Sequence, residues 1–176
     1  MTEGRAVLRD DGTIEFHDMF DEAPPATWAG PVEFAAAYDG EQSDSDERDR
    51  DLGPATSFLY CLAQEAPIWA VDLFREVVVR VNSATVVALG CGPLEDLARH
   101  DSHDVRRIEA IEIAAREVPE FQVALANVWL GDDLPRDLRE RLARVGARDF
   151  VAEEEMAEDA RASYVAHREA RGWGWG

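Results

Sequence analysis

The stretch AQEAPIWAVDL (Ala63–Leu73) is repeated 52 residues further along the chain as AREVPEFQVAL (Ala115–Leu125). The shared frame is A-x-E-x-P-x-(aromatic)-x-V-x-L. A helix is expected to end before each proline, and the proline can open the next helix because its missing N–H has no helical partner there. The aromatic residue two positions later then packs back on the preceding helix. Two such corners, joined by shorter helices around 83–100, predict a small stacked helical-hairpin (HEAT-like) array.

Hydrophobic spacing predicts a mainly α fold from Pro54 onward. Three apolar stripes follow the 3.6-residue helical period: Ile108, Ile111, Ala115 and Val118; Phe121, Leu125, Val128 and Trp129; Leu134, Leu138, Leu142 and Val145. Asp133 is expected to cap the last of these helices, and Gly146 to end it in a left-handed conformation.

The N-terminal region predicts a different local structure. An Asp11-Gly12 pair between two short apolar runs in 6–16 indicates a short β-hairpin. After the break at Pro24-Pro25, a first helix is expected from Trp28 to Tyr38. The predicted organisation is a hairpin and proline-rich connector at 1–25, a helical domain at 26–149 with an acidic loop at 39–53, and a C-terminal helix with a Gly/Trp tail at 150–176.

The charge is strongly acidic, with 37 carboxylates against 18 cationic side chains and a net charge of −19. All 18 cations are arginine, so Schiff-base, general-base and phosphate-loop lysines are excluded. Direct nucleic-acid binding is not expected, because few cations are present to release counterions from a phosphate backbone. Residues 1–60 hold 15 acids and 4 arginines, which is more than half of the net charge.

The acidic excess marks the candidate partner-binding residues. Segment 39–51 is polar and is interpreted either as a solvated connector or as a docking strip for a basic partner. The tail tryptophans either fold back on the domain or insert into a partner. The candidate contacts are Asp44, Asp46, Glu47, Asp49, Asp51, Trp173 and Trp175.

The N-terminal residues 1–5 lead into charged residues without an apolar core, so a secretory signal is not expected. No apolar stretch approaches the length of a membrane span, and scattered arginines offer no patch for anionic lipids. Cys61 and Cys91 are expected to be free thiols. These features predict a cytoplasmic protein without membrane association.

The segment Val86–Gly92 supplies the alternative hypothesis. Its Gly90-Cys91-Gly92 resembles the glycine-rich loop of S-adenosylmethionine-dependent methyltransferases, which follows a β-strand. Glu112 stands 20 residues after Gly92, where that family places a carboxylate for the ribose hydroxyls. Leu94 replaces the third glycine, however, and the segment around Glu112 has helical periodicity.

A second resemblance accounts for the same residues. Gly92-Pro93-Leu94-Glu95-Asp96-Leu97, the Pro119-Glu120-Phe121 stretch and Val128-Trp129 resemble an uncharacterised family of small bacterial all-helical domains. That family carries a G-P-L-E-D-L motif and a downstream P-x-F…V-W motif. The resemblance covers about residues 54–145. It implies an all-helical fold and no known activity.

The remaining motifs do not indicate a metal site or a catalytic nucleophile. His100 and His103 form an H-x-x-H pattern without a third ligand at helical spacing, and Asp101 or Ser102 as a helix cap explains the segment more simply. The serines lie in no G-x-S-x-G context. No catalytic residue, metal or cofactor is predicted.

The sequence therefore predicts a non-enzymatic acidic helical protein that binds a basic protein, as an adaptor, an inhibitor or an immunity-type protein. The alternative is a methyltransferase that uses the Gly90-Cys91-Gly92 loop. The oligomeric state is left open.

Overall fold

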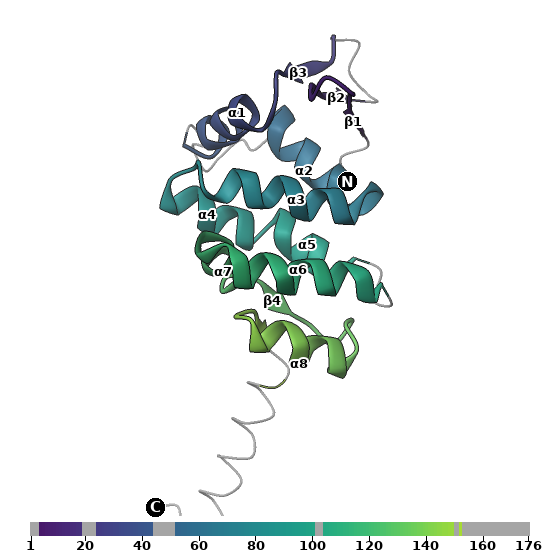
Figure 1. Cartoon of the computed structure of the whole chain (residues 1–176), viewed down its shortest axis with the longest axis vertical. Coiled ribbons are helices and arrows are strands. Elements are labelled where there is room, and N and C mark those ends of the chain that lie inside the picture. Colours follow the sequence, from purple (N-terminus) through teal and green to yellow (C-terminus); the bar gives the residue numbers. More distant parts are fainter. Residues whose placement is uncertain (1–3, 19–23, 44–51, 101–103, 150–151, 153–176) are drawn as a thin grey trace, which may run out of the picture.

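The computed structural model describes residues 4–18, 24–43, 52–100, 104–149 and 152, and helices dominate them (Figure 1). The elements are, in order, β1 (Gly4–Leu8), β2 (Ile14–Asp18), β3 (Ala26–Trp28), α1 (Pro31–Ser43), α2 (Pro54–Glu65), α3 (Pro67–Val78), α4 (Ser83–Gly90), α5 (Pro93–Arg99), α6 (Val105–Glu117), α7 (Pro119–Leu125), β4 (Trp129–Leu130), α8 (Arg136–Arg144) and β5 (Arg148–Asp149). The predicted mainly α fold with a short N-terminal hairpin is confirmed.

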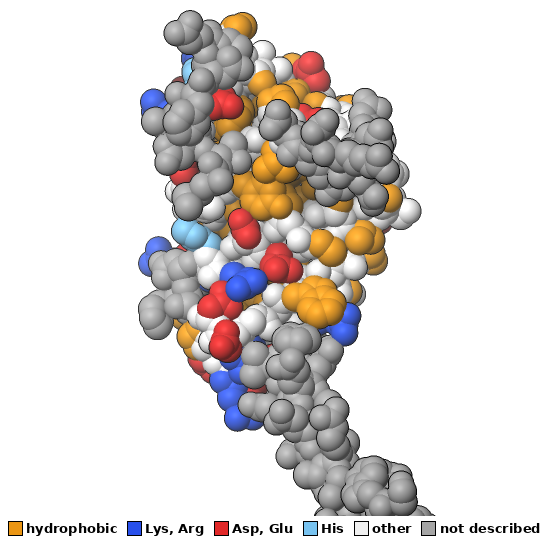
Figure 2. Space-filling model, turned by 180° about the vertical axis from the view of Figure 1, so that it is seen from behind, with side chains coloured by type: hydrophobic (Ala, Val, Ile, Leu, Met, Phe, Trp, Pro, Cys, Tyr) orange, Lys and Arg blue, Asp and Glu red, His pale blue; other side chains and the backbone are white. Residues whose placement is uncertain are grey.

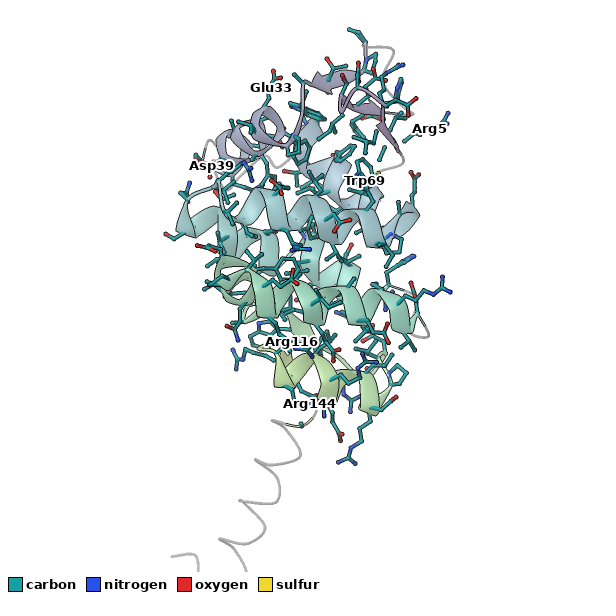
Figure 3. The ribbon with its side chains drawn as sticks, in the orientation of Figure 1. Arg5, Glu33, Asp39, Trp69, Arg116 and Arg144 are labelled. Atoms are coloured by element: carbon teal, nitrogen blue, oxygen red, sulfur yellow. The ribbon has the colours of Figure 1, made fainter. Side chains whose placement is uncertain are left out.

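Both proline corners form as predicted. Helix α2 ends at Glu65 and Pro67 opens α3, while α6 ends at Glu117 and Pro119 opens α7. The Trp69 ring meets the Phe58 ring of α2 edge-on, with 6.0 Å between centroids, so it packs back on the preceding helix. Figure 3 shows Trp69 on the side of α3 that faces the N-terminal strands.

The helices stack in sequence order along the long axis of the molecule (Figure 1). Helix α3 packs on α6 and α6 on α8, while α2 packs on α5 and α5 on β4. The shorter α4 contacts both α7 and α5. The predicted short helices around 83–100 are therefore present, and the HEAT-type character of the stack stays a prediction.

The N-terminal strands form a three-stranded antiparallel sheet in the order β1-β2-β3. The predicted Asp-Gly turn is present, and Gly12 has a φ of 88°. Strand β3 was not predicted. The first helix was expected to begin at Trp28, but Trp28 ends the strand and the helix begins only at Pro31. Gly30, with a φ of 153°, separates the strand from the helix, and Trp28 instead packs its ring 4.9 Å from that of Phe34.

Helix α1 runs further than the sequence indicated. The prediction of an acidic loop at 39–53 is wrong for residues 39–43, which form the last part of α1. The two carboxylates in this part, Asp39 and Glu41, both accept backbone hydrogen bonds from other elements. These contacts tie the end of the helix to the start of α2 and to the loop before α4. Residues 44–51 lie outside the described residues.

The C-terminal part of the domain also departs from the helical prediction. Helix α7 ends at Leu125, and Trp129 lies in β4, which pairs in parallel with β5. The cap predicted at Asp133 is wrong: α8 begins at Arg136, and Asp133 accepts a hydrogen bond from Arg99 Nε at 2.9 Å. Gly146 has the expected left-handed conformation, with a φ of 125°. The predicted C-terminal helix and tail lie outside the described residues, apart from Ala152.

Two arginines are buried within the stack. Arg107 is 0% exposed and donates a hydrogen bond to the carbonyl of Ala98, near the end of α5. Arg139 of α8 pairs with Asp149 of β5 at 3.2 Å and donates to the carbonyl of Leu134. These contacts use charged side chains to join consecutive elements, and buried charges of this kind require such partners.

Gly90 is the point where α4 comes closest to α7. A Cβ atom at this position would collide with the carbonyl oxygen of Ala124 and lie 2.9 Å from Cβ of Asn127. These are backbone and near-backbone atoms that cannot move aside cheaply. The glycine is therefore required by the packing of two helices.

Gly90→Ala is expected to lower the free energy of unfolding by about 2 kcal/mol, since the overpacking outweighs the gain in helix propensity. Urea unfolding followed by circular dichroism measures this. The matched control is Gly40→Ala in α1, where a Cβ would meet nothing within 4 Å. That variant should gain up to about 1 kcal/mol, and an equal response of the two variants would contradict the packing argument.

Candidate functional site

A cavity of about 220 Å³ lies between α1, the start of α2 and the corner that joins α4 to α5. Polar and apolar side chains share its wall. The view from behind shows hydrophobic side chains gathered on the back of the molecule, with acidic and basic side chains nearby (Figure 2). The lining residues are Tyr38, Glu41, Gln42, Leu52, Gly53, Thr56, Tyr60, Ala88, Cys91, Gly92 and Pro93.

The wall of the cavity is fixed by a cap between two helices. Helix α2 begins at Gly53-Pro54 and has no side-chain cap of its own. Glu41 of α1 supplies it: Oε1 accepts from the N–H of Ala55 at 2.9 Å, and Oε2 accepts from the N–H and the hydroxyl of Thr56, each at 2.9 Å. A carboxylate at a helix N-terminus is also favoured by the helix dipole. A Cβ at Gly53 would overlap this carboxylate, so the glycine makes room for it.

Two tyrosines present their rings and hydroxyls to the cavity. Tyr38 is 1% exposed and Tyr60 is half-buried. Within the part of the chain that the structure describes, neither hydroxyl has a hydrogen-bond partner. Burial raises the pKa of both side chains above the ordinary tyrosine value, so both are neutral near pH 7. Each hydroxyl can donate one hydrogen bond and accept others.

Helix α5 adds carboxylates beside Tyr60. Burial is the main cause of the raised Tyr60 pKa, and the negative charges of Asp96 and Glu95 raise it further. Both acids therefore lie close enough to Tyr60 to act on it. A Cβ at Gly92 would lie 2.6 Å from the Tyr60 hydroxyl. The bare backbone at the start of α5 therefore lets Tyr60 reach the cavity.

The two sequence motifs on which the predicted resemblance rests meet at the same helix. Glu95 Oε2 accepts a hydrogen bond from the N–H of Trp129 at 3.1 Å, and Glu95 Oε1 lies 3.3 Å from Nη1 of Arg99. The Trp129 ring is 43% exposed, and the guanidinium of Arg148 lies 4.5 Å from its centre. The G-P-L-E-D-L and V-W segments are thus one structural unit.

The geometry expected for a methyltransferase loop is absent from the described residues. Val86–Leu89 belong to helix α4 and not to a strand, and Gly90 is needed for packing against α7. Glu112, the candidate ribose ligand, is held by Arg141 through hydrogen bonds of 3.0 and 2.9 Å. The described residues therefore do not support the expected strand-and-loop geometry, and methyltransferase activity stays a prediction from the sequence alone.

The residues predicted to bind a partner lie outside the described part of the chain. This applies to the acidic residues at 44–51 and to the tail tryptophans: Asp44, Asp46, Glu47, Asp49, Asp51, Trp173 and Trp175. Asp39, at the start of the same acidic stretch, accepts hydrogen bonds from the backbone N–H and Nδ2 of Asn82 (Figure 3). It therefore holds the loop before α4.

The remaining predictions on chemistry can be placed only in part. His103 lies outside the described residues, and the cap of α6 is Asp104, not Asp101 or Ser102. The described residues contain no group of three or more His, Cys, Asp or Glu side chains arranged to hold a metal. None of the described helices has the length and apolar character needed to span a bilayer. Cys61 is buried and Cys91 is exposed, both as free thiols.

Sequence reasoning missed the cavity and the placement of Tyr38, Glu41 and Tyr60 in its wall. Tyr38, Glu41 and Tyr60 come from two helices separated by the acidic segment, and no short motif contains them. One signal was available. A helix that begins with Gly-Pro has no side-chain cap, so its N–H groups need a partner from elsewhere in the fold.

A family model described as "Family of unknown function (DUF6869)" matches residues 41–150 of the chain. The match agrees with the resemblance to an uncharacterised family, while the family motifs and a bacterial origin stay predictions. No curated protein and no solved structure matches the chain.

Glu41→Gln is expected to lower the free energy of unfolding by about 1–2 kcal/mol, because an amide N–H₂ would then face the N–H donors of α2. Chemical unfolding measures the change. The control is Glu65→Gln, which removes the same charge from an exposed position at the other end of α2. Its expected effect is close to zero, and a loss as large as that of Glu41→Gln would refute the capping role.

Glu112→Gln should cost about 1 kcal/mol of stability at pH 7, since the bidentate pair with Arg141 is only partly exposed. The hydrogen bonds from Arg141 hold the pKa of Glu112 below its usual range, and the charges of Arg116 and Arg144 add to this (Figure 3). This contribution is present above the ordinary glutamate pKa and is lost as the pH falls through the lowered one.

The stability difference between wild type and Glu112→Gln should therefore shrink below about pH 4.5. Thermal unfolding between pH 3 and pH 7 measures it. Glu140→Gln is the control, because its pair with Arg136 is largely exposed and should contribute little at any pH. A pH-independent cost of Glu112→Gln would contradict the ion-pair assignment.

Proposed function

The chain belongs to DUF6869, a family of unknown function, and we propose that this member is a non-enzymatic acidic helical protein that binds a basic partner protein. Adaptor, inhibitor and immunity-type roles all fit this proposal. The observation that carries it is the net charge of −19, with 37 carboxylates against 18 arginines. A protein of this charge attracts basic surfaces and repels nucleic acids.

The internal ion pairs support the proposal, because they already engage many of the arginines. Eight described arginines pair with carboxylates of the same chain: Arg9, Arg75, Arg80, Arg99, Arg116, Arg136, Arg139 and Arg141. Because the chain has 37 carboxylates and 18 arginines, pairing every arginine with one carboxylate would still leave an excess of 19 carboxylates. We propose that this excess is available to an external partner.

Within the proposal, segment 44–51 is the main docking strip. It holds five acids and two arginines, and cavity-lining residues flank it in the sequence, Gln42 before it and Leu52 after it. Trp173 and Trp175 are proposed to add apolar contact area, since tryptophan is enriched at protein interfaces. A HEAT-like stack would serve as the rigid scaffold for these segments, in the cytoplasm, where the free thiols stay reduced.

The test is a charge-neutralised variant of the full chain, in which Asp44, Asp46, Asp49 and Asp51 become asparagine and Glu47 becomes glutamine. The full chain captures basic proteins from cells at low salt, and binding of each captured protein is then measured by calorimetry between about 50 and 500 mM salt. The wild-type affinity should fall steeply with salt, and the variant should bind at least tenfold more weakly.

The matched control neutralises five acids elsewhere, namely Glu153, Glu154, Glu155, Glu158 and Asp159. It changes the net charge by the same amount and should bind nearly as well as the wild type. Equal losses in both variants would show that only the total charge matters and would remove the role of segment 44–51. Salt-independent binding, or no basic partner at all, would overturn the proposed function.

A further inference from the structure

The cavity between α1 and α2 combines three features that point to one kind of occupant. It contains neutral hydroxyls without partners in the described structure, it contains a carboxylate, and it is walled by two tyrosine side chains. We propose that it receives the guanidinium group of an arginine side chain of the partner. This inference rests on the proposed function, because it names how the basic partner is recognised.

The hydrogen-bonding groups fit a guanidinium. This group has five N–H donors in a planar fork and no acceptor, so its site must supply acceptors. The Tyr38 and Tyr60 hydroxyls can each accept, and the Glu41 carboxylate has lone pairs beyond the three hydrogen bonds that it accepts from α2. The Tyr38 side chain is almost entirely buried, so a ligand that donates to its hydroxyl does so in a largely desolvated setting, where hydrogen bonds are stronger.

The charge of the site favours a cation over an anion. Within the described residues, no arginine forms an ion pair with Glu41, which faces only backbone and hydroxyl donors. The charges of Asp96 and Glu95 also act on Tyr60, although Glu95 already pairs with Arg99. A phosphate or carboxylate ligand would be repelled by Glu41 and Asp96, whereas a cation is attracted by them.

The shape of the site favours arginine over lysine. The cavity of about 220 Å³ has room for a planar head together with part of its aliphatic stem. A guanidinium stacks on tyrosine rings and is more weakly hydrated than an ammonium, so it loses less on entering a partly apolar cavity. The lining includes Leu52, Ala88 and Pro93, against which the stem can pack.

Cys91 gives a direct readout of occupancy. Its thiol is exposed and lines the cavity, while Cys61 is buried and serves as an internal control. The full chain is treated with iodoacetamide in the presence of N-acetyl-arginine amide or of N-acetyl-citrulline amide, and alkylation of Cys91 is followed by mass spectrometry. Citrulline has the same shape as arginine but carries no charge.

We expect arginine amide to slow the alkylation of Cys91 with a half-effective concentration at least tenfold below that of citrulline amide. Tyr38→Phe and Tyr60→Phe, which remove only a hydroxyl, should each weaken this protection about fivefold without lowering the melting temperature. Ser83→Ala is the control and should change nothing, because it removes an exposed hydroxyl from a described residue that does not line the cavity.

Equal protection by the two amides, or none up to about 100 mM, would overturn the arginine site. The proposed function would still stand if a basic protein bound with steep salt dependence. A variant with Arg48 and Arg50 changed to glutamine tests whether the chain fills its own cavity. Unchanged protection is expected, and at least tenfold tighter binding of arginine amide would overturn the assignment to a partner.

Discussion

Proline opens five of the described helices, and this constraint determines where one helix of the stack ends and the next begins. Helices α1, α2, α3, α5 and α7 all begin at a proline, which removes one N–H that would lack a helical partner. Proline itself supplies no cap. All five have Gly, Ala or Val before the proline, and α2, α3, α5 and α7 have no side-chain cap. Their remaining N–H groups must be satisfied by the preceding turn, by water or by another element. At α2, the other element is α1, so local sequence and tertiary packing depend on one contact.

Prediction from the sequence succeeded where one proline or one glycine determines the backbone. Pro67 and Pro119 end and begin helices at the expected residues, and Gly12 and Gly146 adopt the expected left-handed conformations. It failed where a tertiary contact overrides a local pattern. Trp129 continues the stripe of Phe121 and Leu125, but its N–H bonds to Glu95 of α5 and the residue enters a two-residue strand. No periodicity is visible in a strand of that length, so β4 and β5 could not have been found.

The acidic stretch that begins at Asp39 combines carboxylates with a structural role and carboxylates that are proposed to bind a partner. Its first two carboxylates, Asp39 and Glu41, are structural: one holds the loop before α4, and the other caps α2. Composition alone treats all acids in 39–51 alike and therefore predicted a single loop. Asp39 and Glu41 accept from backbone N–H groups at the start of α2 and just before α4, and both of these elements come later in the chain. The acids from Asp44 onward stay the candidates within this stretch for contact with a partner.

The cap and the cavity share the same carboxylate, and this links the stability of the fold to the proposed recognition. The hydrogen bonds from Ala55 and Thr56 hold the Glu41 carboxylate in one position, so the fold itself places this group at the cavity wall. The N-terminal dipole of α2 offsets part of that charge and limits how strongly a cation is attracted. The two tyrosine hydroxyls then decide selectivity, because an ion attracted by charge alone would not satisfy them. A guanidinium meets both requirements at once, whereas a simple metal cation would leave the tyrosine rings unused and a neutral ligand would leave the charge unused.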